Sequence, residues 1–428
     1  MFSTLKNIFK VSDLRRRVLF TLAMLAVFRI GSYIPVPNVN AKLFDPSQNA
    51  FLGILNTFSG GALQNFSIFA MSITPYITAS IIVQLLTMDV IPKFAEWAKE
   101  GEHGRKKLAQ ITRYLTVVLG LIQAVGFSLS FDRMVPGLII DKGFATFALI
   151  AITLTAGTAF LMWLGEQITE KGIGNGISLI IFAGIIAQVP RGINTIYTTW
   201  FYTNPDRLFL NLVYVALLLI AIVLVIVGVI YVQQGVRRIP VQYAKRMVGR
   251  NLYGGQTTHI PLKVNAAGVI PVIFATSLLI FPSTVASWFQ PNAVANWIVA
   301  HFSPGPTAWL YITLEVLLII GFTYFYTAIQ INPEQLADQM RKNAGYIPGV
   351  RPGKPTEMFI VRVMNRITLA GALFLAAVSV LPILFMNVAA LNMYFGGTSL
   401  LIIVSVALET MKQLESQLLQ RHYKGFIR

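Results

Sequence analysis

The sequence predicts an all-α integral membrane protein with ten transmembrane helices. Of its 428 residues, 55% are hydrophobic and 12% are charged, and the mean hydropathy is +0.66. Soluble domains average about a quarter charged residues, so this composition is typical of a membrane protein. Apolar runs of about 20 residues, long enough to cross a bilayer, recur along the chain. Membrane spans, rather than two or three soluble domains, therefore account for its length.

The apolar runs predict the spans in chain order. They lie at residues 17–36, 68–88, 112–130, 144–165, 174–190, 209–231, 266–288, 308–330, 366–386 and 396–414. The first follows a basic N-terminal segment and lacks a small-residue cleavage site, so we expect a retained span and not a signal peptide. The fifth, GNGISLIIFAGIIAQVP, is short and rich in glycine, which favours a helix packed closely among others. Ten spans divide into five and five, and a duplicated half with an odd number of spans would be inverted. No convincing sequence repeat relates the halves.

Basic residues are concentrated in alternate connections. The chain has 34 Lys and Arg against 17 Asp and Glu, a net charge of +17. Of the 34, 28 lie in the terminal segments and in every second connection, and Arg29 lies within the first span. Because cytoplasmic loops carry the excess of positive charge, we expect both termini to be cytoplasmic.

Two of the predicted cytoplasmic connections are long, at residues 233–265 and 332–365. The first carries six cations, and the second carries five, with Arg366 directly after it. Alternation of Val and Ile with polar residues around Arg238 and Gln242 predicts a β-hairpin that turns near GRNLYGG. Two interpretations of the loops stay open. They either only set the topology, or they also dock an anionic partner such as ribosomal RNA or an acidic protein surface.

The residue types that metal or nucleotide chemistry needs are not grouped in this sequence. There is no cysteine, and GIGNGIS lacks the G-K-[ST] ending of a phosphate-binding loop, which favours a packing purpose for its glycines. The histidines are far apart and none is paired at metal-ligand spacing. They are His103, His259, His301 and His422.

Arg29 and Glu315 are the charges that clearly intrude into spans. Each is near a helix end, so we expect the side chain to extend to the membrane interface. Ion-coupled transporters usually carry paired ionisable groups near the membrane centre. The spans therefore resemble the walls of a path more than a solute-binding site.

The stretch NTFSGGALQNFS, residues 56–67, fits neither a span nor a solvated loop. No charge occurs between Asp45 and Asp89, yet the stretch is too polar to cross a membrane alone. Its apolar residues recur at roughly helical spacing, namely Leu55, Phe58, Leu63 and Phe66. In the flanking spans, isoleucines four residues apart share one helix face. Pattern alone does not distinguish these isoleucines from ordinary core packing.

Several longer motifs together resemble the SecY family, the pore-forming subunits of the bacterial Sec protein translocon. The resemblance covers essentially the whole chain in the same order. It rests on FSGGALQNFSIFAMSITPYITASIIVQLL, EGEHGRKKLAQITRY, FLMWLGEQITEKGIGNGISLIIFAGI, THIPLKVNAAGVIPVIFATS, GVRPG and YFGGTSLLI.

The resemblance implies two inverted five-helix halves, residues 1–205 and 206–428, around a central hourglass pore. The implied activity is that of a passive channel, which moves unfolded secretory polypeptides across the cytoplasmic membrane and releases hydrophobic segments sideways into lipid. SecA or the ribosome would drive it, SecE would clamp the halves, and SecG would be peripheral. The implied substrates are pre-proteins with signal sequences, and no enzymatic activity, cofactor or metal is expected. The alternatives are a secondary transporter and an intramembrane enzyme, and the latter lacks a catalytic constellation in the spans.

The resemblance also implies functional residues. The plug, residues 54–67, would close the pore from outside and includes Asn56, Phe58, Ser59, Gly60, Gly61, Leu63 and Asn65. The pore ring would be Ile73, Ile77, Ile177, Ile181, Ile273 and Ile402. Polar contacts across a lateral gate between the second and seventh helices would involve Thr78, Gln84, Thr276 and Ser277. The loops would bind the driving partner through Arg237, Arg238, Lys245, Arg246, Arg250, Arg341, Lys342, Arg351 and Lys354. The chain departs from the family where Asn251 follows Arg250 in place of a second basic residue.

Overall fold

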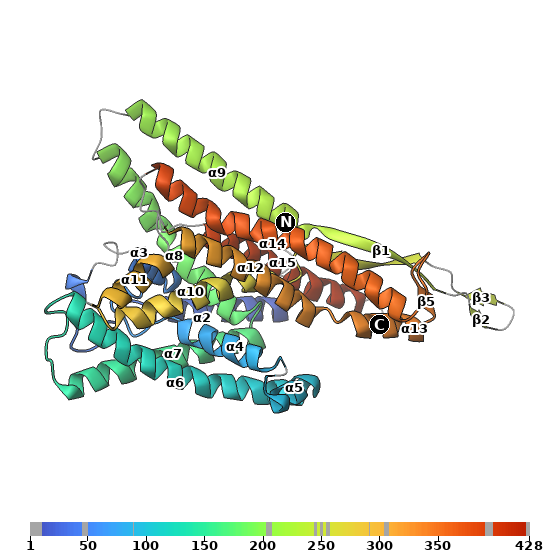
Figure 1. The fold of residues 1–428 in the computed structure, drawn as a ribbon, viewed down its shortest axis with the longest axis horizontal. Helices are drawn as coiled ribbons and strands as arrows, with labels where there is room; N and C mark the ends of the chain where they lie inside the picture. The colour runs from blue at the N-terminus through green and yellow to red at the C-terminus, as the bar shows by residue number, and fades with distance from the viewer. Residues whose placement is uncertain are drawn as a thin grey trace.

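The computed structural model describes most of the chain. The described residues are 11–44, 50–88, 90–202, 208–243, 246–248, 251–253, 257–290, 292–303, 308–389 and 397–424. They form a bundle of helices that run along its long axis, with β strands at one end (Figure 1).

Each predicted span overlaps one helix, and all of these helices except the second have 18 residues or more. In order these are α2 Ser12–Gly31, α4 Thr74–Leu86, α6 Glu102–Met134, α7 Phe144–Lys171, α8 Gly176–Tyr197, α9 Leu208–Gln234, α10 Ile270–Ser287, α12 Trp309–Gln330, α14 Lys354–Ala389 and α15 Gly397–Lys424. Seven helical segments within the described ranges are long and apolar enough to cross a membrane. The prediction of a helical, multi-pass membrane protein is therefore confirmed, whereas the exact number of spans and the two inverted halves stay predictions.

The second predicted span differs from expectation, because only its C-terminal part is helical. Helix α4 has 13 residues and begins at Thr74, whereas the apolar run begins near residue 68. The preceding residues form turns, and Phe66 and Ser72 have positive φ angles of 40° and 52°. Pro75 then occupies the first turn of the helix, where its missing N–H has no cost.

Shorter elements connect the long helices. They are η1 Ala41–Leu43, α3 Ala50–Phe58, α5 Pro92–Lys99, the π-helical turn η3 Thr198–Tyr202, α11 Ala293–Phe302 and α13 Pro333–Lys342. Asparagine side chains cap α8, α11 and α13, as shown by Asn175, whose side chain accepts hydrogen bonds from the N–H groups of Ile177 and Ser178. Such caps satisfy N–H groups that have no partner inside the helix.

The predicted β-hairpin is confirmed in the first long loop. Strand β1 (Val236–Tyr243) pairs antiparallel with β4 (Thr257–Lys263), and β2 (Arg246–Val248) pairs with β3 (Asn251–Tyr253) beyond them. The second long loop adds strand β5 (Gly345–Tyr346), which gives a sheet of order β4-β1-β5. The Tyr346 hydroxyl donates to Gln242 Oε1 at 2.9 Å. The two basic loops thus form one unit, which we call the platform, and we call its end of the molecule the basic end.

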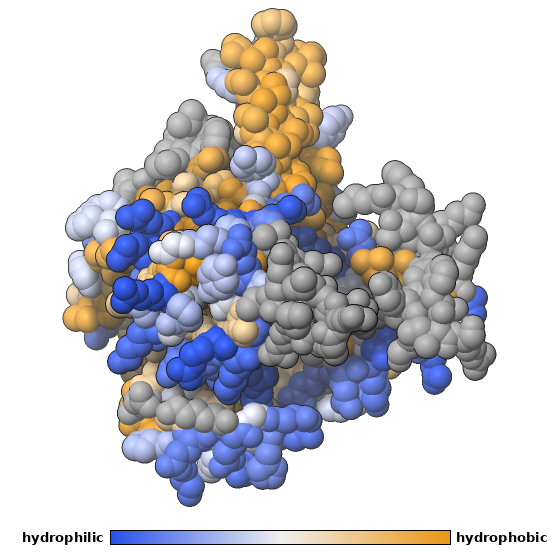
Figure 2. Space-filling view, turned by 90° about the vertical axis from the view of Figure 1, so that its right-hand side faces the viewer, coloured by the Kyte–Doolittle hydropathy of each residue, from blue (hydrophilic) through white to orange (hydrophobic). Residues whose placement is uncertain are grey.

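Helix α9 is exposed along nearly its whole length. Only Asn211 and Val229 of its 27 residues are buried, although the helix is the most apolar of the candidate spans. In Figure 1 it diverges from the bundle, and in Figure 2 it forms the hydrophobic column above a largely hydrophilic end face. Apolar surface of this extent needs lipid or another membrane subunit around it.

Candidate functional site

A cavity of about 680 Å³ lies among α4, α6, α7, α8, α10 and α12. Its lining combines polar and apolar side chains. The polar lining residues are Ser80, Gln84, Arg113, Glu166, Gln167, Thr169, Glu170, Asn175 and Ser178, and the apolar ones are Tyr76, Ile77, Trp163, Ile177, Ile181, Ile270, Ile273, Phe274 and Tyr326. Isoleucines of α4, α8 and α10 therefore form part of its wall.

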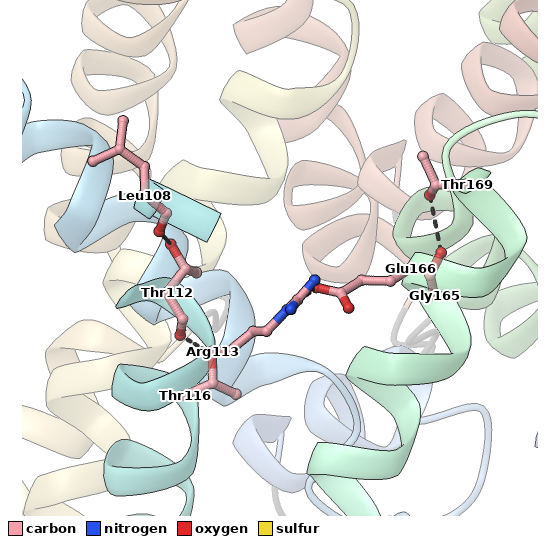
Figure 3. Close-up of polar contacts among 7 residues, drawn as sticks. All are labelled: Leu108, Thr112, Arg113, Thr116, Gly165, Glu166 and Thr169. Atoms are coloured by element: carbon pink, nitrogen blue, oxygen red, sulfur yellow. Dashed lines mark hydrogen bonds and ion pairs between the residues drawn. The ribbon is translucent and has the colours of Figure 1, made fainter. Parts of the chain in front are cut away.

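An ion pair crosses the polar wall of this cavity. Arg113 of α6 and Glu166 of α7 extend toward each other between the helices (Figure 3), with Nε and Oε1 2.7 Å apart. Both side chains are partly exposed, so the pair contributes at most about 1 kcal/mol to stability. Pairing leaves this part of the wall polar, with the two charges compensated.

The structure gathers the six predicted ring isoleucines from four helices. Five of them are buried in one cluster, which we call the isoleucine cluster, and Ile177 is half-buried against it. The five are Ile73, Ile77, Ile181, Ile273 and Ile402. Ile77, Ile177, Ile181 and Ile273 also line the cavity. The six residues thus belong to one packed region, four of them at the cavity wall, and their role as a ring stays a prediction.

The plug segment is helical at its start but not throughout. Helix α3 ends at Phe58, and Gly60 and Gly61 have φ angles of 68° and 86°. The N–H of Gly61 donates to the carbonyl of Asn56 at 2.9 Å and that of Gly60 to Thr57 at 3.1 Å, the two bonds of a Schellman motif. The helical spacing expected through Phe66 is therefore wrong beyond Phe58, because these glycines end the helix.

The segment is nevertheless packed inside the protein. Leu55, Leu63 and Phe66 are buried in a second cluster, which we call the phenylalanine cluster and which contains Phe127 and Phe131. Ala62 is fully buried within the isoleucine cluster. The side chain of Phe58 lies outside the described part of the chain.

The backbone N–H groups of the plug segment find hydrogen-bond acceptors within the segment itself. Every N–H from Ser59 to Ser67 donates to an oxygen atom within residues 55–67. Two of these bonds use side chains, because Leu63 donates to the Ser59 hydroxyl and Gln64 donates to Asn56 Oδ1. Non-helical backbone at membrane depth requires such satisfaction.

The cavity, the isoleucines and the plug segment contact successive positions along helix α8. Ile177 and Ile181 line the cavity, and Gly184 contacts Gly60, where an added Cβ would lie 2.7 Å from the Gly184 Cα. One turn later, Gln188 Nε2 donates to the carbonyl of Asn56 at 3.3 Å. The rise between Ile181 and Gln188 is about 10 Å at 1.5 Å per residue. Cavity, isoleucine cluster and plug segment therefore follow one another from the basic end.

The two intramembrane charges have different surroundings. Arg29 donates through Nη1 to the Gly60 carbonyl at 2.7 Å and through Nη2 to the Tyr33 hydroxyl at 3.0 Å, so it contacts the plug segment. Glu315 is 1% exposed and accepts a hydrogen bond from the Ser379 hydroxyl of α14. Its second oxygen has no partner among the described residues. Extension to the interface was the wrong prediction for Glu315, because sequence position does not reveal the neighbouring helix, and it stays a prediction for Arg29.

We expect Glu315→Gln to keep or raise stability and Ser379→Ala to lower it. Glutamine retains an oxygen for the Ser379 hydroxyl and removes a carboxyl group from an apolar site. Alanine at residue 379 leaves both buried carboxyl oxygens without a donor, at a cost of about 1–3 kcal/mol. Thermal unfolding in detergent measures the difference. A larger loss for Glu315→Gln than for Ser379→Ala would show that the carboxyl group itself is required.

The four predicted gate residues lie on α4 and α10, which pack against each other. The expected polar contacts across the interface are replaced by other bonds. The hydroxyls of Thr78 and Thr276 donate to carbonyls of their own helices, and Gln84 accepts from Tyr326 of α12 at 2.7 Å. Ser277 is buried in α10. Gate membership stays a prediction, and the bond between Tyr326 and Gln84 is a contact that sequence reasoning missed.

The basic loop residues are presented on the platform. Arg237 and Arg238 are exposed on β1, and an exposed group follows in the second loop, namely Arg341, Lys342, Arg351 and Lys354. Lys245 and Arg250 lie outside the described residues, and of Arg246 only the backbone in β2 is described.

Two remaining predictions concern glycine and metals. An added Cβ at Gly176 would lie 1.9 Å from the Gly165 carbonyl oxygen, so the packing purpose of GIGNGIS is supported. Across the described ranges, no three His, Asp or Glu side chains are grouped as metal ligands.

The comparisons with known proteins decide the family. The SecY family model matches residues 67–411, and a protein translocase subunit SecY from Halalkalibacterium halodurans is 61% identical, with both chains covered completely. The chain belongs to the SecY family. A SecY from Bacillus subtilis is 58% identical, again over the full length of both chains.

Solved channel structures show the same SecY-family fold. One described as a protein-conducting channel has a TM-score of 0.62 at 20% identity and covers 94% of this chain and 92% of its own. A second, described as a SecY whose plug domain stabilises the closed state and maintains a membrane seal, has a TM-score of 0.61 at 20% identity with the same coverage. Sec61 in a canine ribosome-channel complex has a TM-score of 0.58 at 19% identity, covering 94% and 92%.

Proposed function

We propose that this chain forms the channel through which unfolded secretory polypeptides cross the cytoplasmic membrane. The observation that carries the proposal is the order of parts along α8, in which isoleucine side chains line a large cavity and a packed segment comes next. Branched apolar side chains exclude water and ions at rest and make no hydrogen bonds that would retain a passing peptide. The six isoleucines in and against the isoleucine cluster then form the pore ring, and residues 54–67 form the plug.

Sideways release of hydrophobic segments requires an opening between helices. The pair α4 and α10 supports this role, because α4 is short and both helices line the cavity. Together with the family, this supports two halves, residues 1–205 and 206–428, that separate at a lateral gate. Both termini would be cytoplasmic, since the basic end carries the loops rich in Lys and Arg.

The energy for transport comes from a partner at the platform. Its exposed arginines and lysines suit an acidic protein surface or RNA, which fits SecA or the ribosome. The canine relative in its ribosome complex supports this inference. SecE and SecG would occupy the membrane around the bundle, and α9 offers apolar surface for a neighbour or lipid.

Reconstitution tests the function directly. The chain, with its SecE and SecG, is placed in lipid vesicles and supplied with SecA, ATP and a pre-protein carrying a signal sequence. We expect the pre-protein to become protected from external protease only when ATP is present. Uptake of small solutes without pre-protein protection would instead favour a secondary transporter.

We expect Arg351→Glu to reduce SecA-driven transport by about tenfold without loss of folded protein. Arg351 is exposed between Pro348 and Pro352, which stiffen the loop, and a hydrogen bond to a charged group contributes about 1.5–3 kcal/mol. Surface substitutions change stability by about 0.5 kcal/mol or less.

Arg105→Glu is the matched control, since Arg105 is exposed at the start of α6 and outside the platform. Initial transport rates at equal membrane abundance provide the measurement. Equal rates for Arg351→Glu and Arg105→Glu would contradict a specific role of Arg351.

A further inference from the structure

The plug segment is joined to the channel wall by polar side chains from both flanking helices. Arg29 of α2 donates to the Gly60 carbonyl at 2.7 Å, and Gln188 of α8 donates to the Asn56 carbonyl at 3.3 Å. Arg191, also of α8, donates through Nη1 to Gln64 Oε1. All three acceptors are neutral oxygens, and neither guanidinium group has an ion-pair partner among the described residues.

Gly60 and Gly61 leave space beside these three side chains that a Cβ atom would fill. An added Cβ at Gly61 would lie 2.9 Å from Gln188 Nε2 and 3.0 Å from Arg191 Nη1. At Gly60 it would lie 3.4 Å from Arg29 Nη1 in addition to its collision with Gly184. A side chain at residue 61 would therefore crowd Gln188 and Arg191, and one at residue 60 would collide with the Gly184 backbone.

A different kind of contact holds the C-terminal end of the segment. The N–H of Val36 donates to the Phe66 carbonyl and the N–H of Ile68 donates to the Ile34 carbonyl, both at 3.0 Å, and Pro35 and Ser67 form a β-bridge. Backbone–backbone pairing anchors this end, whereas side chains hold the part around Gly60 and Gly61.

We propose that Arg29, Gln188 and Arg191 form a latch that holds the plug closed, with residues 66–68 as the hinge. The proposal rests on the plug role given above. Because the segment satisfies its own N–H groups, it leaves as a unit. The latch bonds, the hydrogen bond from Asn65 Nδ2 to the Ser32 carbonyl at 3.2 Å and the apolar contacts then have to break. Water from the outer side satisfies the released guanidinium groups, so no buried ion pair opposes opening. The latch residues position the plug and do not contact substrate in the closed state.

The proposal predicts leakage when a latch cation is removed. Losing one hydrogen bond to a charged group shifts a two-state equilibrium by roughly tenfold or more. We therefore expect Arg29→Gln and Arg191→Gln each to raise the resting ion conductance of vesicles containing the assembled channel by about tenfold. Arg29→Lys and Arg191→Lys should restore part of the seal, since lysine keeps a cationic donor.

Arg133→Gln is the matched control. Arg133, near the end of α6, donates to the Trp288 carbonyl at 3.2 Å and makes no bond to the plug segment. It should leave conductance at the parental level. A latch variant that leaks no more than Arg133→Gln, at equal abundance, overturns the proposal.

A double-mutant cycle tests the one latch bond that joins two side chains. If Arg191 acts through Gln64, the variant with both Arg191→Gln and Gln64→Ala should leak no more than the leakier single variant. Additive effects would show that Arg191 does not act through the plug. Deletion of Asn56–Asn65 separates this outcome from failure of the plug role itself. A leaky deletion with tight latch variants rejects only the latch, whereas a tight deletion rejects the plug.

A labelling measurement does not depend on conductance. The sequence has no cysteine, so Leu63→Cys introduces a single thiol at a position that is 2% exposed. A membrane-impermeant maleimide should label it about tenfold faster with Arg29→Gln than with Arg133→Gln. Equal labelling rates would overturn the latch even if the latch variants were poorly expressed.

Discussion

Ile77→Asn, Ile273→Asn and Ile402→Asn are each expected to give a stable channel that opens more readily and accepts defective signal sequences. In a closed protein core an asparagine amide without a partner costs a few kcal/mol, so the protein would be lost. In a pore ring beside a cavity that water can enter, the same amide is hydrated and admits water to the constriction. Ile77 and Ile273 line the cavity, which places them within reach of that water.

The measurement pairs membrane abundance with secretion of a reporter that carries a defective signal sequence. Ile150→Asn is the matched core control, because Ile150 is fully buried in the phenylalanine cluster, away from the cavity. We expect it to lose abundance without gain of secretion. Ile→Leu at the three ring positions should be nearly silent, since volume is conserved. Ring variants that behave like Ile150→Asn would assign these isoleucines to packing alone.

Deletion of Asn56–Asn65 is expected to give a folded channel that leaks ions and selects signal sequences poorly. The deletion removes Leu63 from the phenylalanine cluster but leaves Leu55 and Phe66, so most of that packing remains. It also removes Ala62, the plug residue that packs with the isoleucine cluster. The ring then closes the pore alone, and we expect a rise in resting conductance larger than that of either latch variant.

Single-channel recording and reporter secretion at matched abundance test this expectation. Gly61→Ala provides a milder comparison, because it keeps the chain length and places a methyl group against the latch side chains. Its leak should lie between those of the parental protein and the deletion. Parental conductance and parental signal-sequence selection in the deletion would show that residues 54–67 are not the plug.

The parts predicted well from sequence depend on local periodicity or composition. Each of the ten apolar runs overlaps a helix, and the alternating strand of the first loop forms the hairpin β1–β4. The early end of α3 also depends on local sequence, because Gly60 and Gly61 provide the positive φ angles that stop a helix. That signal was present in the sequence and outweighs the apolar spacing that continues to Phe66.

The parts missed depend on contacts between distant segments. Strand β5 has two residues, too few for a periodic pattern, and it forms because residue 346 meets residue 242. Ser379 is 64 residues from Glu315, and Gln188 is 132 residues from Asn56. Only the packing of helices shows that these side chains meet. A single sequence contains no spacing from which such pairs could be read.

The self-bonded backbone of the plug affects what can be learned from amide hydrogen exchange. Each amide from Ser59 to Ser67 bonds within the segment, so these protons remain protected while the segment swings out intact. Slow exchange there would measure the integrity of the plug and not its position. The amides of Val36 and Ile68 bond across the hinge to the rest of the chain, so their exchange reports whether the anchor itself has opened. Closed and open channels are therefore distinguished by the solvent accessibility of plug side chains, not by backbone protection.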